Sequence, residues 1–276
     1  MNIAVIGGGE RHRCLGKTLE DYGHTVIYIA DPARGVPQTI HAFQTAWEVQ
    51  ATRVLQSTGE VQVAVLPVPT GSECEALIGM LPDSCIVFGW NVPGKIMSAY
   101  KTYDFGKMEH VAALNAVATA EGCIAEMITH GKINITGSRC LITGYGRCAK
   151  EIASKLQAFG ACVTIAARDR AAREHAACHG MDVCNMFERD SYREYDYVIN
   201  TVPAMVIGRR EAEKMNDDVV IIDIASMPGG TDLVYCREHG IKAVHTLGLP
   251  GKYSPKTSGR ILANAIIDLT DNITDE

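Results

Sequence analysis

Short apolar segments alternate with stretches of helical spacing along most of the chain, and this alternation restricts the possible folds more than any other feature. The segments are rich in valine and isoleucine and end at glycine, proline or polar residues, as strands do. The expected strands are 3–6, 25–29, 61–66, 85–88, 140–143, 162–167, 197–200, 219–224 and 242–245. Strands that are separated by helices pair in parallel, because a parallel partner is reached only through a crossover. The sequence therefore predicts an α/β protein with parallel sheets.

The expected strands form two series, which predicts two doubly wound domains. An N-terminal flavodoxin-like or Rossmann-like domain is expected at 1–110 and a second, Rossmann domain at 111–256. A largely helical stretch from about 105 to 131 connects them. The tail at 257–276 is expected to form a helix that packs back on the first domain, because its apolar residues share one face. Those residues are Ile261, Leu262, Ala265, Ile266 and Leu269.

Charge and cysteine usage exclude several classes of partner and compartment. The 276 residues are 47% hydrophobic and 21% charged, with a formal net charge of −6 and no basic stripe. This balance disfavours a nucleic acid or an anionic membrane as a partner. The chain opens with a segment typical of a buried strand and not of a signal peptide, and no apolar run is expected to span a membrane. The 10 cysteines include no CxxC pair, so we expect reduced thiols and a cytoplasmic protein.

No metal site is expected from the histidines. His175 and His179 have the i, i+4 spacing of a helical ligand pair. No third ligand lies nearby in the sequence, and the surrounding helix is charged, so a position at the surface is favoured over a metal site.

A glycine turn follows the expected strand at 140–143 and opens the next helix. It reads Gly144, Tyr145, Gly146, Arg147, Cys148 and Ala149. In such a turn the first glycine permits the sharp bend, the second admits a pyrophosphate to the backbone amides, and the third small residue permits close helix packing. The positive end of the helix attracts phosphate, and Arg147 is a candidate for an additional charged contact. Cys148 has an alternative role as a thiol at the helix start, but a packing role is favoured. The pattern predicts a dinucleotide-binding Rossmann domain.

The end of the following strand indicates which dinucleotide is bound. Arg168 stands where an NAD-binding domain usually carries a carboxylate for the ribose 2′-hydroxyl, and Arg170 is close by. Arginine suits a 2′-phosphate because its planar fork binds such groups through two hydrogen bonds. We therefore expect NADP as the cofactor, with NAD as the alternative because Asp169 follows directly.

An earlier glycine turn, at 7–12, is a weaker candidate for a nucleotide site. It lacks a small third residue, and Glu10 would direct a carboxylate toward any phosphate. A tight strand-to-helix turn is the favoured interpretation.

Polar loops elsewhere supply further candidate binding residues. Asn200, Thr201, Val202 and Pro203 follow a strand, so they are expected near the nicotinamide ribose or in a simple loop. After the strand at 219–224, a loop contains Ser226, Gly229, Gly230 and Thr231. Its amides are expected either to form an anion-binding nest or to belong to an elaborate helix cap that includes Asp232.

Three further residues are candidates for contact with an acidic substrate or for proton transfer. Lys256 and Thr257 begin the C-terminal helix, where they are expected to bind an acidic group or to be solvated. Glu121 lies in the connecting stretch and is a weak candidate for proton transfer, with a helix-capping role as the alternative. Lys256 is likewise a weak catalytic candidate.

Several of these segments together resemble the A subunit of dipicolinate synthase over about 114–267. The Ser-x-Pro-Gly-Gly-Thr-Asp and Gly-Leu-Pro-Gly…Pro-Lys-Thr segments are the most specific, and the first hundred residues match more loosely. The family is itself similar to the nucleotide domains of D-2-hydroxyacid dehydrogenases and adenosylhomocysteinase. The matching segments are 119–122, 144–147, 199–203, 225–232 and 248–257.

The resemblance implies an NAD(P)-dependent oxidoreductase that acts in sporulation, in the cytoplasm of the mother cell. Together with a flavoprotein, the B subunit of the synthase, it would oxidise a cyclic dihydro- or hydroxytetrahydro-dicarboxylate from a branch of the lysine pathway to dipicolinate. The expected substrate is thus a small dicarboxylate, and a homo-oligomer is expected. Two alternatives stay open, namely a non-catalytic cofactor-binding scaffold for the flavoprotein and an enzyme like the 2-hydroxyacid dehydrogenases.

Overall fold

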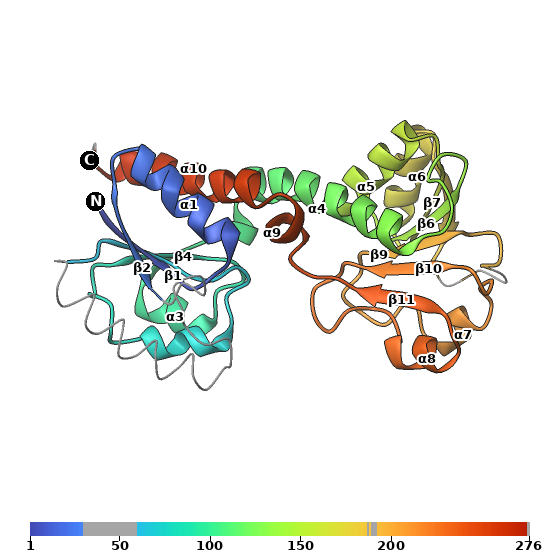
Figure 1. Ribbon diagram of the computed structural model, residues 1–276, viewed down its shortest axis with the longest axis horizontal. Coiled ribbons are helices and arrows are strands. Elements are labelled where there is room, and N and C mark those ends of the chain that lie inside the picture. The colour runs from blue at the N-terminus through green and yellow to red at the C-terminus, as the bar shows by residue number, and fades with distance from the viewer. Residues whose placement is uncertain (30–59, 187, 189–191, 275–276) are drawn as a thin grey trace. The chain divides into compact units, whose positions relative to one another are not determined.

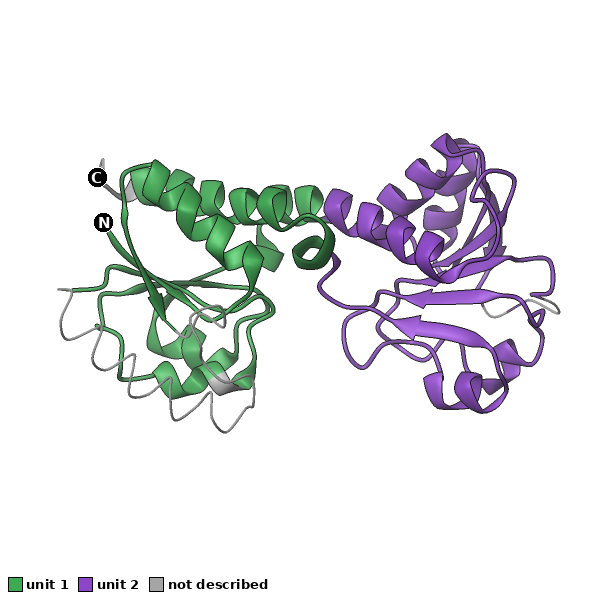
Figure 2. Ribbon diagram, in the orientation of Figure 1, with its two compact units in different colours: residues 1–115, 250–276 green, residues 116–249 purple. Residues whose placement is uncertain are grey.

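The computed structural model describes residues 1–29, 60–186, 188 and 192–274 (Figure 1). The chain divides into two compact units (Figure 2). Unit 1 comprises Met1–Asn115 and Pro250–Glu276, and unit 2 comprises Ala116–Leu249. The boundaries expected from the sequence lay after 110 and 256. The observed first boundary, after Asn115, falls inside helix α4 (Glu109–His130), which continues through it without interruption. The observed second boundary, after Leu249, falls inside the short helix α9 (Leu249–Tyr253). Domain boundaries are recognised in a sequence by loop residues, and a boundary inside a helix has none, so these boundaries could not be located from the sequence.

Unit 1 contains a five-stranded parallel sheet in the order β2-β1-β3-β4-β5. This is the flavodoxin-like order, in which the direction of winding reverses between the first and third strands. The strands are β1 (Asn2–Ile6), β2 (Thr25–Ile29), β3 (Val63–Val65), β4 (Ile86–Gly89) and β5 (Lys101–Asp104). The predicted N-terminal α/β fold is confirmed.

Helices cover both faces of this sheet. Figure 1 shows α1 (Glu10–Asp21) and α10 (Pro255–Thr274) side by side over one face. They bury Leu15, Leu19 and Ile266 against the sheet. The predicted C-terminal helix thus packs on the first unit, with its last two residues, 275–276, outside the described part of the chain. The other face is covered by η2 (Ser72–Leu77) and α3 (Gly94–Ala99), and η3 (Phe105–Lys107) follows β5.

Unit 2 contains a six-stranded parallel sheet in the order β11-β10-β9-β6-β7-β8. Counted from the first strand of the unit this is 3-2-1-4-5-6 read from the β8 edge, the dinucleotide-binding Rossmann order. The strands are β6 (Arg139–Thr143), β7 (Cys162–Ala167), β8 (Asp182–Asn185), β9 (Tyr197–Asn200), β10 (Val220–Asp223) and β11 (Lys242–His245). The helices that follow within the unit are α5 (Arg147–Ala158), α6 (Arg170–Cys178), α7 (Arg209–Ala212) and α8 (Leu233–Glu238). The Rossmann prediction is confirmed.

Helix α4 corrects one expectation from the sequence. It is long and apolar enough to cross a membrane by length and composition, although we expected no such segment. Within its most apolar window, 61% of the helix is buried inside the protein. Ala120, Cys123 and Met127 pack in the core of unit 2 beneath α5 and the sheet. The apolar character of α4 therefore reflects its place in a protein core.

Candidate functional site

The glycine turn between β6 and α5 has the geometry that a bound pyrophosphate requires. Gly144 has a φ of +89°, and a Cβ there would lie 2.7 Å from Thr201 Oγ1. Any side chain at this position is therefore excluded by both conformation and space. At Gly146, in contrast, a Cβ would meet no described atom within 4 Å, and no described side chain caps the amino end of α5. Open space thus lies before the start of α5, where the first backbone N–H groups of the helix have no intrahelical acceptor and can bind a phosphate.

The third position of the turn packs the helix on the sheet. Ala149 is completely buried among the core residues between α5 and the strands. Neighbouring Cys148 is half-buried, and burial raises the pKa of its thiol above the usual value. A thiol in this environment stays protonated at neutral pH, which argues against the alternative role of Cys148 as a reactive thiolate. The arrangement is that of a nucleotide-binding turn.

A buried hydrogen-bond network ties together the loops that follow β6, β9 and β10. Asn200 is fully buried, and its Oδ1 accepts from Thr143 Oγ1 at 2.6 Å and from the Val202 amide at 3.0 Å. Its Nδ2 donates to Asp223 Oδ1 at 2.8 Å and to the Val202 carbonyl at 3.0 Å. All hydrogen-bonding positions of this amide are therefore used. Asn200, predicted to contact the cofactor ribose, shapes the cofactor-side loops and offers no free polar atom.

The neighbouring loop residues differ in how far they are available to a ligand. Thr201 donates through its hydroxyl to the Thr143 carbonyl at 2.7 Å, so it too reinforces the junction of β6 and β9. Val202 is half-buried and Pro203 is exposed. In this loop, the groups available for the predicted cofactor contacts are therefore the backbone and the apolar side chains of Val202 and Pro203.

The loop after β10 is held mainly by its own hydrogen bonds. The Gly230 amide donates to Asp223 Oδ2 at 2.8 Å, and the Gly229 amide donates to the Ser226 carbonyl at 2.9 Å. The predicted anion-binding nest is therefore wrong for these two amides, because both already have acceptors. A Cβ at Gly230 would lie 2.4 Å from the Ala204 carbonyl oxygen, so close packing explains this glycine.

Two hydroxyl groups remain as candidate ligand contacts in that loop. Ser226 is exposed, whereas Thr231 is 8% exposed and its buried Oγ1 has no hydrogen-bond partner among the described residues. Asp232 caps α8 by accepting from the Tyr235 amide at 2.9 Å, as the capping interpretation predicts.

The residues that follow β7 carry two arginines and one aspartate, and the aspartate is used as a helix cap. Asp169 caps α6 by accepting from the amides of Ala171 and Ala172, both at 3.2 Å. Arg170 forms an exposed ion pair with Glu174 at 2.7 Å. The guanidinium of Arg168 is exposed and forms no hydrogen bond or ion pair in the described part of the chain. Asp169 thus caps the helix, while the guanidinium of Arg168 is available to a 2′-phosphate.

Arg173, which we did not single out from the sequence, adds to this positive region. Its Nη1 donates to the carbonyl oxygens of Ala167 at 2.6 Å and of Arg168 at 2.7 Å. It therefore holds the backbone from which Arg168 projects. In the sequence, the one sign of this backbone-holding role is that Arg173 lies one turn into the helix that follows β7.

Glu121 and Glu126, on the same helix, differ in burial and partners. Glu121, the predicted proton-transfer candidate, is exposed and lies 3.4 Å from Lys155 Nζ. Glu126 is 2% exposed, accepts from Thr246 Oγ1 at 3.0 Å and lies 3.2 Å from His130 Nε2. The buried carboxylate of α4 is thus Glu126, which we missed.

The remaining substrate-binding candidates and the histidines can also be placed. Lys256 and Thr257 are exposed in the first turn of α10, within unit 1, whereas Ser226 and Thr231 belong to unit 2. His175 and His179 are exposed and stacked with ring centroids 4.5 Å apart, which agrees with their expected surface position. Among the described residues, no group of three or more metal-ligating side chains occurs.

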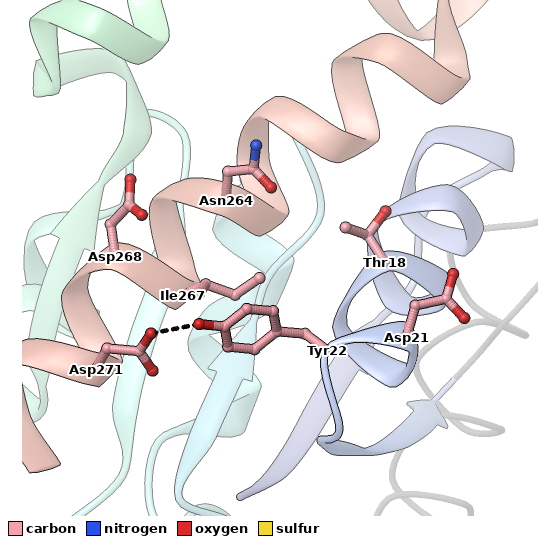
Figure 3. A pocket seen from close by; sticks show the side chains of 7 residues that line it. All are labelled: Thr18, Asp21, Tyr22, Asn264, Ile267, Asp268 and Asp271. Atoms are coloured by element: carbon pink, nitrogen blue, oxygen red, sulfur yellow. Dashed lines mark hydrogen bonds between the residues drawn. The ribbon is translucent and has the colours of Figure 1, made fainter.

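A surface pocket in unit 1 is lined mainly by polar side chains from α1 and α10 and is not a nucleotide site. It has a volume of about 440 Å³ and contains three carboxylates (Figure 3). Figure 3 shows the Tyr22 hydroxyl directed at Asp271, to which it donates at 2.7 Å. Negative charge here repels an anionic cofactor. The lining residues are Thr18, Asp21, Tyr22, Asn264, Ile267, Asp268 and Asp271.

The Rossmann strand order and the open glycine turn define an NAD(P)-binding protein. Residues 100–248, more than half of the chain, match the family model described as S-adenosyl-L-homocysteine hydrolase, NAD binding domain. Over its full length the chain is 29% identical to the A subunit of dipicolinate synthase from Bacillus subtilis (strain 168), covering 98% of that protein. The chain therefore belongs to the family with this NAD-binding domain and is a homologue of the dipicolinate synthase A subunit.

Solved structures agree with this relationship. The crystal structure of the dipicolinate synthase A subunit from Bacillus halodurans matches with a TM-score of 0.81 at 26% identity, over 97% of both chains. The A chain from Bacillus subtilis matches with a TM-score of 0.78 at 26% identity, over 100% of this chain and 97% of that one. A transhydrogenase from Sinorhizobium meliloti, at 14% identity and a TM-score of 0.64 over 97% of this chain and 92% of that one, shares the fold. The predicted family resemblance is confirmed.

Proposed function

We propose that this chain is the NADP-linked subunit of a dipicolinate synthase. In this reaction a cyclic dihydro- or hydroxytetrahydro-dicarboxylate is oxidised to dipicolinate, which is pyridine-2,6-dicarboxylate. The full-length match to the dipicolinate synthase A subunit carries the proposal. The open turn at Gly146 and the free guanidinium of Arg168 support the nucleotide part of it.

The residues present fit an NADP molecule bound along the carboxyl edge of the sheet in unit 2. The amides at the start of α5 would bind the pyrophosphate, and Arg147, which is exposed, stands beside them. Arg168 would bind the 2′-phosphate. Asp169 strengthens the preference for NADP, because a carboxylate used as a helix cap is not available for the 2′-hydroxyl of NAD.

The oxidation needs little chemistry from the protein side chains. The hydroxytetrahydro form would first lose water to give the dihydro ring. The dihydro ring would then lose one hydride and one proton; bound NADP would supply the hydride acceptor, and the proton would pass to solvent. Aromatisation of the ring drives the reaction, so the chain's own residues need mainly to position the substrate. Ser226 and Thr231, in the loop after β10 of unit 2, are the proposed substrate contacts.

We also propose that the chain works with a flavoprotein, the B subunit, in the cytoplasm of the mother cell of a sporulating bacterium, and that it forms a homo-oligomer. The relative's designation as a subunit supports a second component.

The test is to follow NADPH formation and dipicolinate absorbance together, with the chain alone and with its flavoprotein partner. We expect both signals to rise together in wild type. A Gly146→Val variant should lose the NADP-dependent signal because the branched side chain fills the phosphate position, whereas an Arg237→Ala variant, at an exposed position of α8, should keep it. Tight NADPH binding without any cofactor turnover, with or without the partner, would refute the enzymatic role in favour of a scaffold.

A further inference from the structure

Unit 1 contains a buried cation that has no acidic partner among the described residues. Arg11, in the first turn of α1, is 8% exposed. Its Nη2 donates to the Val68 carbonyl, and its buried Nε has no acceptor among the residues that the structure describes. Within the described ranges, no carboxylate forms an ion pair with it. Burial lowers the pKa of this guanidinium to about 10, so it remains charged at neutral pH.

Such a charge is unfavourable in the free protein. Removing a guanidinium from water costs free energy that a counter-ion or a full set of hydrogen bonds normally offsets. Within the described ranges, Arg11 makes one hydrogen bond, to a neutral carbonyl, and its Nε makes none. The fork of N–H groups therefore has capacity for an anion, and two parallel hydrogen bonds to a carboxylate suit it best.

The position of Arg11 in the sheet topology is that of a ligand site. The strand order of unit 1 reverses between β1 and β3. Arg11 follows β1, Val68 follows β3, and the hydrogen bond between them spans this reversal. Open α/β sheets bind ligands at such switch points, outside the carboxyl ends of the strands.

The surroundings of Arg11 add to this assignment. In the described part of unit 1, no side chain caps the start of α1, and a Cβ at Gly9 would meet no atom within 4 Å. Gly251 lies against the guanidinium, since a Cβ there would be 3.6 Å from Arg11 Cζ. Glu10 also lies in this first turn but is exposed. The adjacent ring of His12 is neutral, because burial and the neighbouring Arg11 charge lower its pKa to about 4.

We propose that Arg11 binds a carboxylate group of a small organic dicarboxylate at the switch point of unit 1. The assignment of a dicarboxylate rests on the proposed function, whereas the site itself lies in unit 1 and not at the nucleotide-binding turn of unit 2. A single guanidinium matches the single negative charge of a carboxylate better than the two charges of a phosphate.

The experiment is calorimetric titration of the full chain, without cofactor, with pyridine-2,6-dicarboxylate. Arg11→Met should weaken binding at least about tenfold, the loss expected for a charged hydrogen-bonded pair. Arg13→Met is the matched control, because Arg13 is exposed two residues away on the same helix, and its affinity should equal that of wild type. Inorganic phosphate should compete weakly or not at all.

Two measurements keep the outcome decisive. If Arg11→Met does not fold, Arg11→Lys replaces it; this variant keeps the charge, loses the planar fork and should still bind the dicarboxylate less tightly. Unchanged dicarboxylate affinity in a folded Arg11 variant, or no binding by wild type, overturns the proposal. NADPH affinity should be the same in all these variants. Failure of the wild type to bind NADPH would instead contradict the proposed function and leave the Arg11 result standing.

Discussion

Replacing Arg168 with alanine removes the unpaired positive group at the end of β7 while leaving the backbone there in place. The Arg168 side chain is exposed and forms no hydrogen bond or ion pair within the described chain, so the substitution breaks no such interaction there. Arg173 continues to hold the carbonyl groups of residues 167 and 168. A change in nucleotide affinity would therefore report the loss of a direct contact with the ligand.

The size of the expected effect follows from the exposure of Arg168. A hydrogen bond to a charged group contributes about 1.5–3 kcal/mol, and solvent screening at an exposed site reduces this to roughly 1–2 kcal/mol. The Kd for NADPH should therefore rise by about 5- to 30-fold. The Kd for NADH should not change, because NADH has no 2′-phosphate.

Titration of wild type and variant with both nucleotides, by calorimetry, gives the ratio of the two dissociation constants. Arg237→Ala is the matched control, since Arg237 is equally an exposed arginine of unit 2 but lies in α8, after a different strand of the sheet. Its ratio should equal that of wild type. If wild type prefers NADH, or if Arg168→Ala leaves the NADPH to NADH ratio unchanged, the argument for NADP from this strand end fails.

Two further predictions concern stability. Asn200→Ala should lower the free energy of unfolding by about 2–4 kcal/mol in denaturant titration, because it leaves buried polar partners in three loops unpaired. Asn264→Ala, at an exposed position, serves as the control. An equal loss of unfolding free energy in the two variants would contradict the role of the network. His12 is neutral in the folded state, with its pKa lowered to about 4 mainly by burial. The contribution of neutral His12 to the free energy of unfolding is therefore complete above pH 6.5, the ordinary pKa of the group. This contribution is lost as the pH falls toward 4, which lowers the free energy of unfolding by up to about 3 kcal/mol. His12→Gln should flatten the pH dependence of the unfolding free energy in this window and the exposed His110→Gln should not; parallel curves for His12→Gln and wild type would contradict the assignment.

The central strands of both sheets were predictable because their residues are apolar on both faces. β1, β7 and β9 match the expected segments closely. The two strands that we missed, β5 and β8, lie at sheet edges and read Lys-Thr-Tyr-Asp and Asp-Val-Cys-Asn. An edge strand has one partner and a solvated side, so it can carry polar residues that erase the apolar signal.

The parts of the candidate site that depend on local sequence were predictable, and the parts that depend on tertiary placement were not. The turn at Gly144 follows a local rule, and the capping role of Asp169 also has a local signal, since aspartate before a helix is a common N-cap. Glu126 looks like any other helical glutamate until Thr246 is brought to it across 120 residues of chain.

Arg11 illustrates the same limit more clearly, because its local sequence argues against a binding role. Its turn lacks a small third residue and begins a helix with Glu10, and both facts disfavour a phosphate site. They do not bear on a carboxylate, which needs a guanidinium fork and no close approach to a row of backbone amides. The decisive property is that Arg11 is buried without an acidic partner in the described chain, and this arises only when the loop after β3 and the segment at Gly251 fold against it. The two glycine turns of this chain thus follow the same topological rule, at the reversal of strand order, while offering different chemistry to a ligand.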